Sequence, residues 1–409
     1  MKGLIQIFLL FCFFPYIDII HIGTDTQPNA LIFGSILLFA IKDKRLNGPI
    51  IILWMLFCLS LVMAMFSTLP VFITIKNILN YLSPALISLA VYAIFQRAGY
   101  RIQFRFFLTV VLIYMFVGVM QMFFVNEFAA GLVNQARGIL WGGRGVISLT
   151  PEPAYYGSMC LFLLVFAFLN FTKKQNMILA PLLLVQVFFM AQSATAIAVL
   201  LAAAIVFVII QMLRFRIKYV FLFVVMVFAI NTSVNYLEKL SENSRAAHLF
   251  TVFLDDPLVI AQADASASVR LTNTLSPFIA MRHNSFMPLG FGQYRDLLIE
   301  LYHEGKYRKL ITRHSVYEKE RLGGGINMIL FHLGFIGLLF PLAIILSFKK
   351  RLREDLVLFS LLIFMFLLFS QIPLMHSMIG VIIATALFSG NYSTMVDKSK
   401  TITFRSSQV

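Results

Sequence analysis

Charged side chains are scarce in this sequence, and their scarcity decides the class of protein. Only 12% of the 409 residues are Asp, Glu, Lys or Arg, whereas 60% are hydrophobic and 43 are phenylalanine. A soluble domain has about 25% charged residues and is about half apolar. The composition excludes an array of ordinary soluble domains. It predicts an all-α, polytopic membrane bundle in which residues 1–409 form one integral membrane domain.

Cysteine and metal-binding motifs are also nearly absent. The three cysteines, Cys12, Cys58 and Cys160, lie in apolar runs, and no CxxC or Cys/His cluster occurs. We therefore expect no metal centre and no cofactor. No internal repeat supports an inverted-repeat transporter. No small-x-small cleavage site follows the apolar N-terminus, so we expect a retained first helix rather than a signal peptide.

Apolar runs that approach membrane-spanning length recur along the chain. A span needs about 20 such residues. We predict twelve segments, at about 4–22, 28–41, 49–66, 71–95, 106–126, 152–171, 178–192, 195–212, 219–231, 323–347, 356–373 and 377–390. With a cytoplasmic N-terminus and alternating sides, 19 of the 33 Lys and Arg residues fall in cytoplasmic segments. The positive-inside rule then predicts that both termini are cytoplasmic.

Two regions on the predicted outer side carry charge. They are the loop at 126–151 and a long loop at about 232–322. Helical periodicity within Tyr236–Leu254 and Tyr294–Leu310 predicts that the long loop is partly helical and forms a folded cap. Nearly all the remaining bases lie at the termini or in short loops between apolar runs, so the formal charge of +15 reflects membrane topology rather than nucleic-acid binding.

The outer stretch 137–157, RGILWGGRGVISLTPEPAYYG, gathers opposite charges beside a predicted span. Arg137 and Arg144 precede a Pro-Glu-Pro in which Glu152 stands where the chain re-enters an apolar segment. A carboxylate at that depth is costly without a partner or water. Glu152 could be a general base, a partner of an arginine, or a charge favoured by the helix dipole after Pro151. We interpret the stretch as half of an active site.

Further arginines fall in the long outer loop. Arginine suits diphosphate because its planar donors grip two phosphate oxygens and keep their charge. The surroundings of Arg270, ASASVRLTNTLSPF, predict a short helix at the membrane surface. Arg282 and Arg313 could serve the same purpose or be loop cations in contact with solvent. His283 could be a base or simply a solvated loop histidine.

Small and polar residues mark two helix starts. Gln192–Thr195 joins two apolar segments almost without a loop, which predicts close helix approach. Gly323–Gly325 and Asn327 open the tenth segment, where a glycine-rich helix start could receive an anion or allow tight packing.

Taken together, the motifs resemble those of the Wzy-type polysaccharide polymerases of O-antigen, colanic acid and exopolysaccharide. Gly142-Gly143-Arg144 followed by Glu152-Pro153-Ala154 is similar to their basic-then-Glu-Pro signature. Ser193-Ala194-Thr195 resembles their Ser-rich turn, and Ser268-Val269-Arg270 resembles their loop arginine. The many-helix plan with one large late outer loop also matches and implies a GT-C-like fold.

The resemblance implies a metal-independent membrane glycosyltransferase of a bacterial inner membrane. Its substrates would be undecaprenyl-diphosphate-linked oligosaccharides, which it would join into O-antigen, capsule or exopolysaccharide. Glu152, Arg144 and Arg270 would be catalytic, and the substrate-binding residues would be Arg137, Arg282, His283, Arg313 and Asn327. Expected partners are membrane lipids and a chain-length-regulating protein, with no nucleic acid.

Two other functions remain open from the sequence. The related O-antigen ligases carry His-Asn and then Gly-x-x-Gly after the large loop. Here Asn327, Gly334 and Gly337 match, but the histidine position is Ile326, which favours a polymerase over a ligase acting on lipid A core. A polysaccharide or lipid flippase would be expected to show pseudosymmetry or charges buried mid-membrane, whereas the unusual charges here cluster at one outer face.

Overall fold

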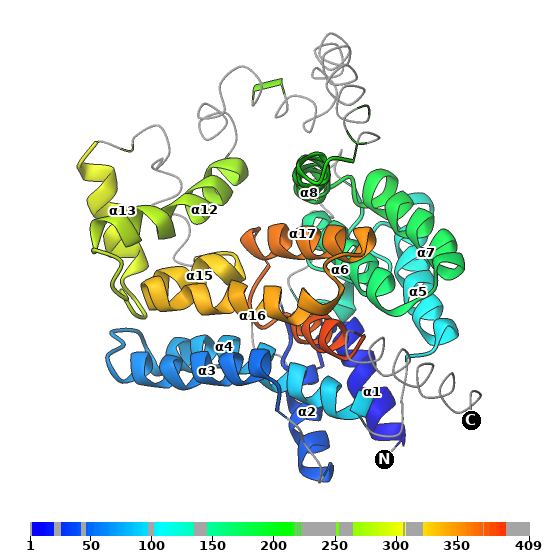
Figure 1. Cartoon of the computed structure of the whole chain (residues 1–409), viewed down its shortest axis with the longest axis horizontal. Helices are drawn as coiled ribbons and strands as arrows, with labels where there is room; N and C mark the ends of the chain where they lie inside the picture. Colours follow the sequence, from blue (N-terminus) through cyan, green and yellow to red (C-terminus); the bar gives the residue numbers. More distant parts are fainter. Residues whose placement is uncertain are drawn as a thin grey trace, which may run out of the picture.

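The chain forms a bundle of helices (Figure 1). The computed structural model describes residues 2–19, 26–41, 46–96, 102–134, 145–216, 219, 221, 251–252, 265–305, 307, 322–370 and 372–389. Within these ranges the regular structure is helical, and a lone bridge between Ile17 and Val133 is the only β-pairing. The predicted all-α class is confirmed.

Seven described helices are long and apolar enough to cross a membrane, and four shorter apolar helices accompany them. The spans include α3 (Gly48–Met65), α4 (Val71–Gln96), α5 (Phe104–Phe123), α6 (Pro153–Asn170), α7 (Lys173–Val185, continued by η2, Gln186–Ala191) and α8 (Ala194–Leu213). The shorter ones are α1 (Lys2–Phe13), α2 (Asn29–Ala40), α17 (Asp355–Phe369) and a last helix, Ser377–Ser389. The predicted ninth segment, 219–231, lies almost entirely outside the described residues, so the count of twelve stays a prediction.

The centre of the bundle is built on α6 and α17. α17 packs against both α6 and α8, with the rings of Phe162 and Phe364 6.2 Å apart. α6 is buried along almost its whole length, from Tyr156 to Ala167, because apolar residues cover every face of it. A helix that is hydrophobic all round belongs in a core, and α6 occupies that place.

Contacts distinguish the two ends of the bundle. At one end, Arg216 Nη1 donates to both carboxylate oxygens of Asp355 at 2.7 Å. At the other end, the Val146 amide donates to the Met190 carbonyl at 2.8 Å. Segments that the charge pattern assigns to the same side therefore meet each other. Which end faces the cytoplasm rests on the charge distribution alone.

The predicted tenth segment, 323–347, is not one continuous helix. It consists of α15 (Gly325–Leu333), η3 (Gly334–Leu338) and α16 (Leu339–Phe348), with Gly334 at φ 55°. A Cβ built on Gly337 would lie 2.7 Å from the Ile329 carbonyl oxygen. Eight residues rise about 12 Å in a continuous helix, so this approach requires the chain to turn back on itself. The apolar pattern continues through the turn although only α15 is buried throughout, because α16 also carries apolar side chains on its exposed face.

The predicted cap contains α12 (Ala265–His283) and α13 (Tyr294–His303), at the upper left of Figure 1. The helix expected around Arg270 is thus present, and the one expected at 294–310 is found with its end at His303. α12 packs on α15, and the Tyr294 hydroxyl donates to Asn273 Oδ1 at 2.6 Å. The expected helix within Tyr236–Leu254 lies almost entirely outside the described residues.

Candidate functional site

A small hollow lies where the starts of three helices meet the end of a fourth. Its cavity volume is about 10 Å³, and its lining comes from α6, α8, α12, α17 and the segment after it. The lining residues are Ala154, Tyr155, Ser158, Thr195, Arg270, Ser370 and Ile372. That volume accommodates about one water molecule or one oxygen atom of a ligand. The hollow brings together residues that are more than 200 positions apart in the sequence.

The first turns of α6 and α8 both open on this hollow. α6 begins at Pro153, whose fixed φ and missing N–H suit a first helical position. α8 begins after Ser193, whose hydroxyl oxygen accepts from the Ala196 amide at 3.2 Å. The helix dipoles make both starts electropositive. An anionic side chain or an anionic ligand is therefore favoured between these two helix starts.

A glycine allows these two helix starts to approach so closely. A Cβ on Gly157 would lie 2.7 Å from Ala196 Cβ and 2.8 Å from Ser193 Cβ. Gln192, at φ 45°, makes the sharp junction between η2 and α8. The close approach predicted from the small residues at 192–195 is confirmed, with Gly157 as the partner surface.

Arg270 adds a permanent positive charge to the hollow. Its Nη1 donates to Thr195 Oγ1, which ties α12 to the first turn of α8. The preceding residues, Ser268 and Val269, are buried, whereas Arg270 is half-buried. A guanidinium and two helix starts thus converge on one point, an arrangement that strongly favours a bound anion.

The opposite wall is the turn that ends α17, and Asn327 holds it in place. Asn327 Nδ2 donates to the Phe369 carbonyl at 2.9 Å, next to Ser370 in the lining. Gly324 has φ 87°, and a Cβ there would lie 2.4 Å from the Ser370 carbonyl oxygen. The predicted binding residue Asn327 is therefore a buried support of the wall rather than part of the lining.

Glu152 is the residue before the first turn of α6. Its backbone carbonyl accepts from the Tyr156 amide at 3.1 Å and from Thr150 Oγ1 at 2.9 Å. Glu152 is half-buried and stands two positions before Ala154 of the lining. Its place at a helix start agrees with the dipole interpretation, and its proximity to the hollow also fits a role beside Arg270.

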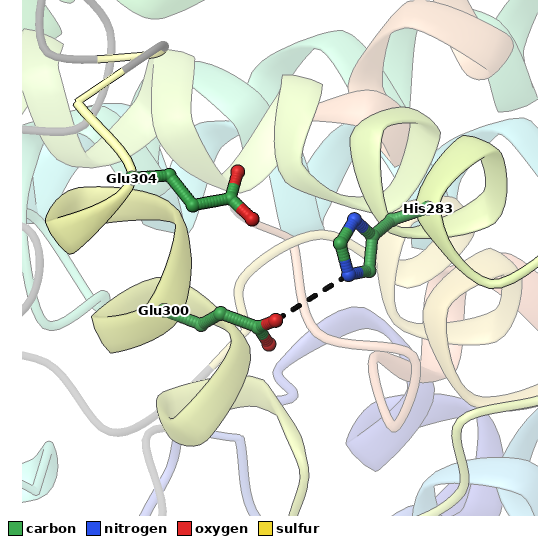
Figure 2. Close-up of side chains that lie close together, drawn as sticks. All are labelled: His283, Glu300 and Glu304. Atoms are coloured by element: carbon green, nitrogen blue, oxygen red, sulfur yellow. Dashed lines mark ion pairs between the residues drawn. The ribbon is translucent and has the colours of Figure 1, made fainter.

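The other predicted site residues divide into two groups. Arg137, Arg144 and Arg313 lie outside the described residues. Arg282 and His283 are exposed at the far end of α12, where His283 Nε2 lies 3.4 Å from Glu300 Oε1 (Figure 2). Thirteen residues separate Arg270 from His283, roughly 20 Å along a helix. The structure therefore puts Arg270 in the lining, Asn327 behind one wall and Glu152 two residues before Ala154 of the lining, and it leaves Arg282 and His283 away from the hollow.

Sequence reasoning missed several lining residues. Thr195 lies in the turn whose small residues predict a close approach of helices, and that pattern does not mark it as a lining residue. Tyr155 and Ser158 follow the Pro-Glu-Pro by a few positions. Ser370 and Ile372 carry no sequence signal, because only the packing of α17 against α6 brings its end here.

The arrangement can bind an oxyanion without a metal, using a guanidinium, a hydroxyl and the positive ends of two helix dipoles. Such preorganised donors stabilise negative charge that develops on a departing group. No protein-family model matches this sequence, and neither does any curated protein.

Proposed function

We propose that this protein polymerises lipid-linked oligosaccharide repeat units at the outer face of a bacterial inner membrane. The observation that carries the proposal is Arg270 bonded to Thr195 in a hollow faced by the starts of α6 and α8. A guanidinium beside two positive helix starts offers charge and hydrogen-bond donors to an anionic ligand. A diphosphate attached to a membrane lipid, such as undecaprenyl diphosphate, is such an anion.

The proposed reaction is metal-independent glycosyl transfer. An acceptor hydroxyl of one repeat unit attacks the anomeric carbon of a second, growing glycan. A new C–O bond forms as the bond from that carbon to the diphosphate oxygen breaks, and undecaprenyl diphosphate leaves with the electron pair. Arg270 stabilises the departing charge, with Arg144 as a catalytic partner and Arg137 and Arg313 as supporting cations. Glu152 takes the acceptor proton or orients an arginine.

The membrane setting is part of the proposal. The distribution of basic residues predicts that both termini are cytoplasmic, and the hollow would then face outward, where lipid-linked repeat units would arrive. The GT-C-like architecture, the O-antigen, capsule or exopolysaccharide product and a chain-length-regulating partner come from the resemblance to Wzy-type polymerases. Arg282 and His283 are placed outside the transfer site because of their distance along α12 from Arg270.

Deletion of the gene in its host tests the function. We expect surface glycan to shorten to single repeat units, and the wild-type gene to restore the ladder of chain lengths. Lipid-linked polymer with bare lipid A core would show a ligase instead. Repeat units retained on the cytoplasmic face would show a flippase. Either of the last two results would overturn the polymerase proposal.

Replacement of Glu152 tests the proton-transfer role. Glu152→Gln keeps the size of the side chain but removes its basicity, so we expect about 10²–10⁴-fold less polymer per unit of membrane protein. Glu127→Gln is the matched control, because Glu127 is exposed in the same predicted outer region. Chain-length ladders from cells producing equal amounts of each variant provide the measurement. Equal polymer from both variants would remove Glu152 from the mechanism.

A further inference from the structure

A second group of functional side chains lies at the other end of α12. His283 is the last residue of this helix, and it faces Glu300 of α13 and Glu304, the residue that follows α13 (Figure 2). One potential ligand atom from each residue lies within 4.8 Å of the other two. All three side chains are exposed, so an ion from solvent would reach them freely.

These residues provide one imidazole nitrogen and two carboxylate oxygens. His283 Nε2 and Glu300 Oε1 are 3.4 Å apart. Two ligand atoms of a tetrahedral zinc ion, each about 2.0–2.1 Å from the metal, are separated by roughly 3.4 Å. The distance found in the structure is therefore already that of two neighbouring ligands. Glu304 follows the last residue of α13 with helical backbone angles, so it lies next to Glu300, four residues earlier.

We propose that His283, Glu300 and Glu304 bind one divalent transition-metal ion, with zinc as the preferred ion. The imidazole ligand favours zinc and its first-row neighbours over magnesium and calcium, which prefer oxygen. Three protein ligands leave a fourth tetrahedral position, which a water molecule fills.

The surroundings support a cation rather than a simple ion pair. Asp296 lies one turn before Glu300, so three carboxylates follow one another along one face of α13, and like charges at this spacing repel. A cavity of about 240 Å³, lined by Asp296, Gln293 and Asn284 among others, adjoins the group. It has room for the ion's water ligand and polar groups to bond that water.

The ion would fasten α12 to α13. The connection between the helices contains Ser285 at φ 50° and Phe286 at φ 66°, conformations that are unfavourable for these residues and need support from the folded structure. The proposed ion is a structural clamp that goes beyond the transfer function. It takes no part in glycosyl transfer, since His283 is roughly 20 Å along α12 from Arg270.

Zinc titration of the full chain tests the clamp. The protein, purified in detergent with a tag free of histidine and stripped with EDTA, competes with a chromophoric chelator for Zn²⁺. We expect one site, weakened more than about tenfold in His283→Ala and in Glu304→Gln. His303→Ala is the matched control, because His303 is an exposed histidine of α13 outside the group, and it should bind zinc as the wild type does.

The result does not depend on glycan substrate, so it is independent of the polymerase proposal. Cobalt(II) bound to the unmodified chain should give the visible absorption of a tetrahedral nitrogen–oxygen site, which avoids any variant that folds poorly. Absence of stoichiometric zinc in the wild type would overturn the proposal. Equal affinity in His283→Ala and His303→Ala would also overturn it.

Discussion

The two ends of α12 place similar residues in opposite environments. At its start, Arg270 is half-buried against α8 and faces the hollow. At its end, Arg282 and His283 are exposed beside the acidic face of α13. A cation in solvent needs no explanation, whereas one held among helix starts beside apolar segments does. The same helix thus connects a candidate anion site with a candidate cation site.

The largest expected effect separates the two arginines of α12. Arg270→Ala should lower polymer yield by about 10²–10³-fold, because it removes a donor aimed at the developing charge. Arg282→Ala changes the same residue type on the same helix and should stay within about threefold of wild type, because its side chain is solvated. Ladders of chain length in membranes of the deletion host, at matched protein levels, give the comparison.

A conservative variant checks the interpretation of this pair. Arg270→Lys keeps the positive charge but loses the planar donors, so it should recover part of the activity lost in Arg270→Ala. Equal losses in Arg270→Ala and Arg282→Ala would mean that the two ends of α12 do not differ in function.

The next effect concerns the wall of the hollow. Gly324→Ala should destabilise the protein by about 2–4 kcal/mol, since alanine is strained at φ 87° and its Cβ would meet the Ser370 carbonyl oxygen. Gly131→Ala is the matched control, because no atom lies within 4 Å of a Cβ built there. Thermal unfolding in detergent measures both. If Gly324→Ala unfolds at the wild-type temperature, the wall is not fixed by this contact.

The smallest expected effect lies between the two ends of α12. Tyr294→Phe removes the hydrogen bond to buried Asn273 and should cost about 1–2 kcal/mol of unfolding free energy. Tyr302→Phe, on the same helix, is the control and should be nearly neutral. Unfolding by denaturant in detergent, with and without zinc, compares them. A larger loss in Tyr302→Phe would contradict the packing described for α12 and α13.

The stability that the hydrogen bond from Tyr294 to Asn273 contributes should decrease at high pH. Burial raises the pKa of Tyr294 to about 12, because the phenolate is excluded from the packed interface. The neutral phenol donates the hydrogen bond to Asn273. Its contribution to the free energy of unfolding is therefore complete below a pH of about 10, the pKa of a tyrosine in the unfolded chain, and is lost as the pH rises through the pKa of Tyr294 in the folded chain. Tyr294→Phe should therefore remove this loss of stability at high pH.

Sequence patterns predicted much of the fold. Runs of apolar residues indicated nearly every described helix, and the small residues at 192–195 indicated the close junction before α8. The prediction failed at Gly334, where an unbroken apolar run conceals a reversal of the chain. Both arms of the turn are apolar, whether their side chains are buried as in α15 or partly exposed as in α16, so only the backbone angle at Gly334 reveals the turn.

The candidate site was only partly foreseeable. Arg270 and Glu152 were singled out because a charge next to an apolar segment is costly. Ser158 and Ser370 have side chains that occur anywhere, and nothing local distinguishes them. Thr195 lies in a junction that predicts close helix packing but not a contact with Arg270. They become part of one site because Gly157 allows α6 and α8 to meet and because α17 ends against them.

By itself, the sequence determined that this chain is a helical membrane protein with charge gathered on particular loops, because the apolar interior of a bilayer restricts composition directly. The tertiary structure decided which charges share a site. Helix starts separated by long stretches of chain converge only through packing. The two ends of α12 acquire different neighbours that no local pattern specifies. Arg270 therefore faces a hollow suited to an anion, and His283 joins carboxylates suited to a metal ion.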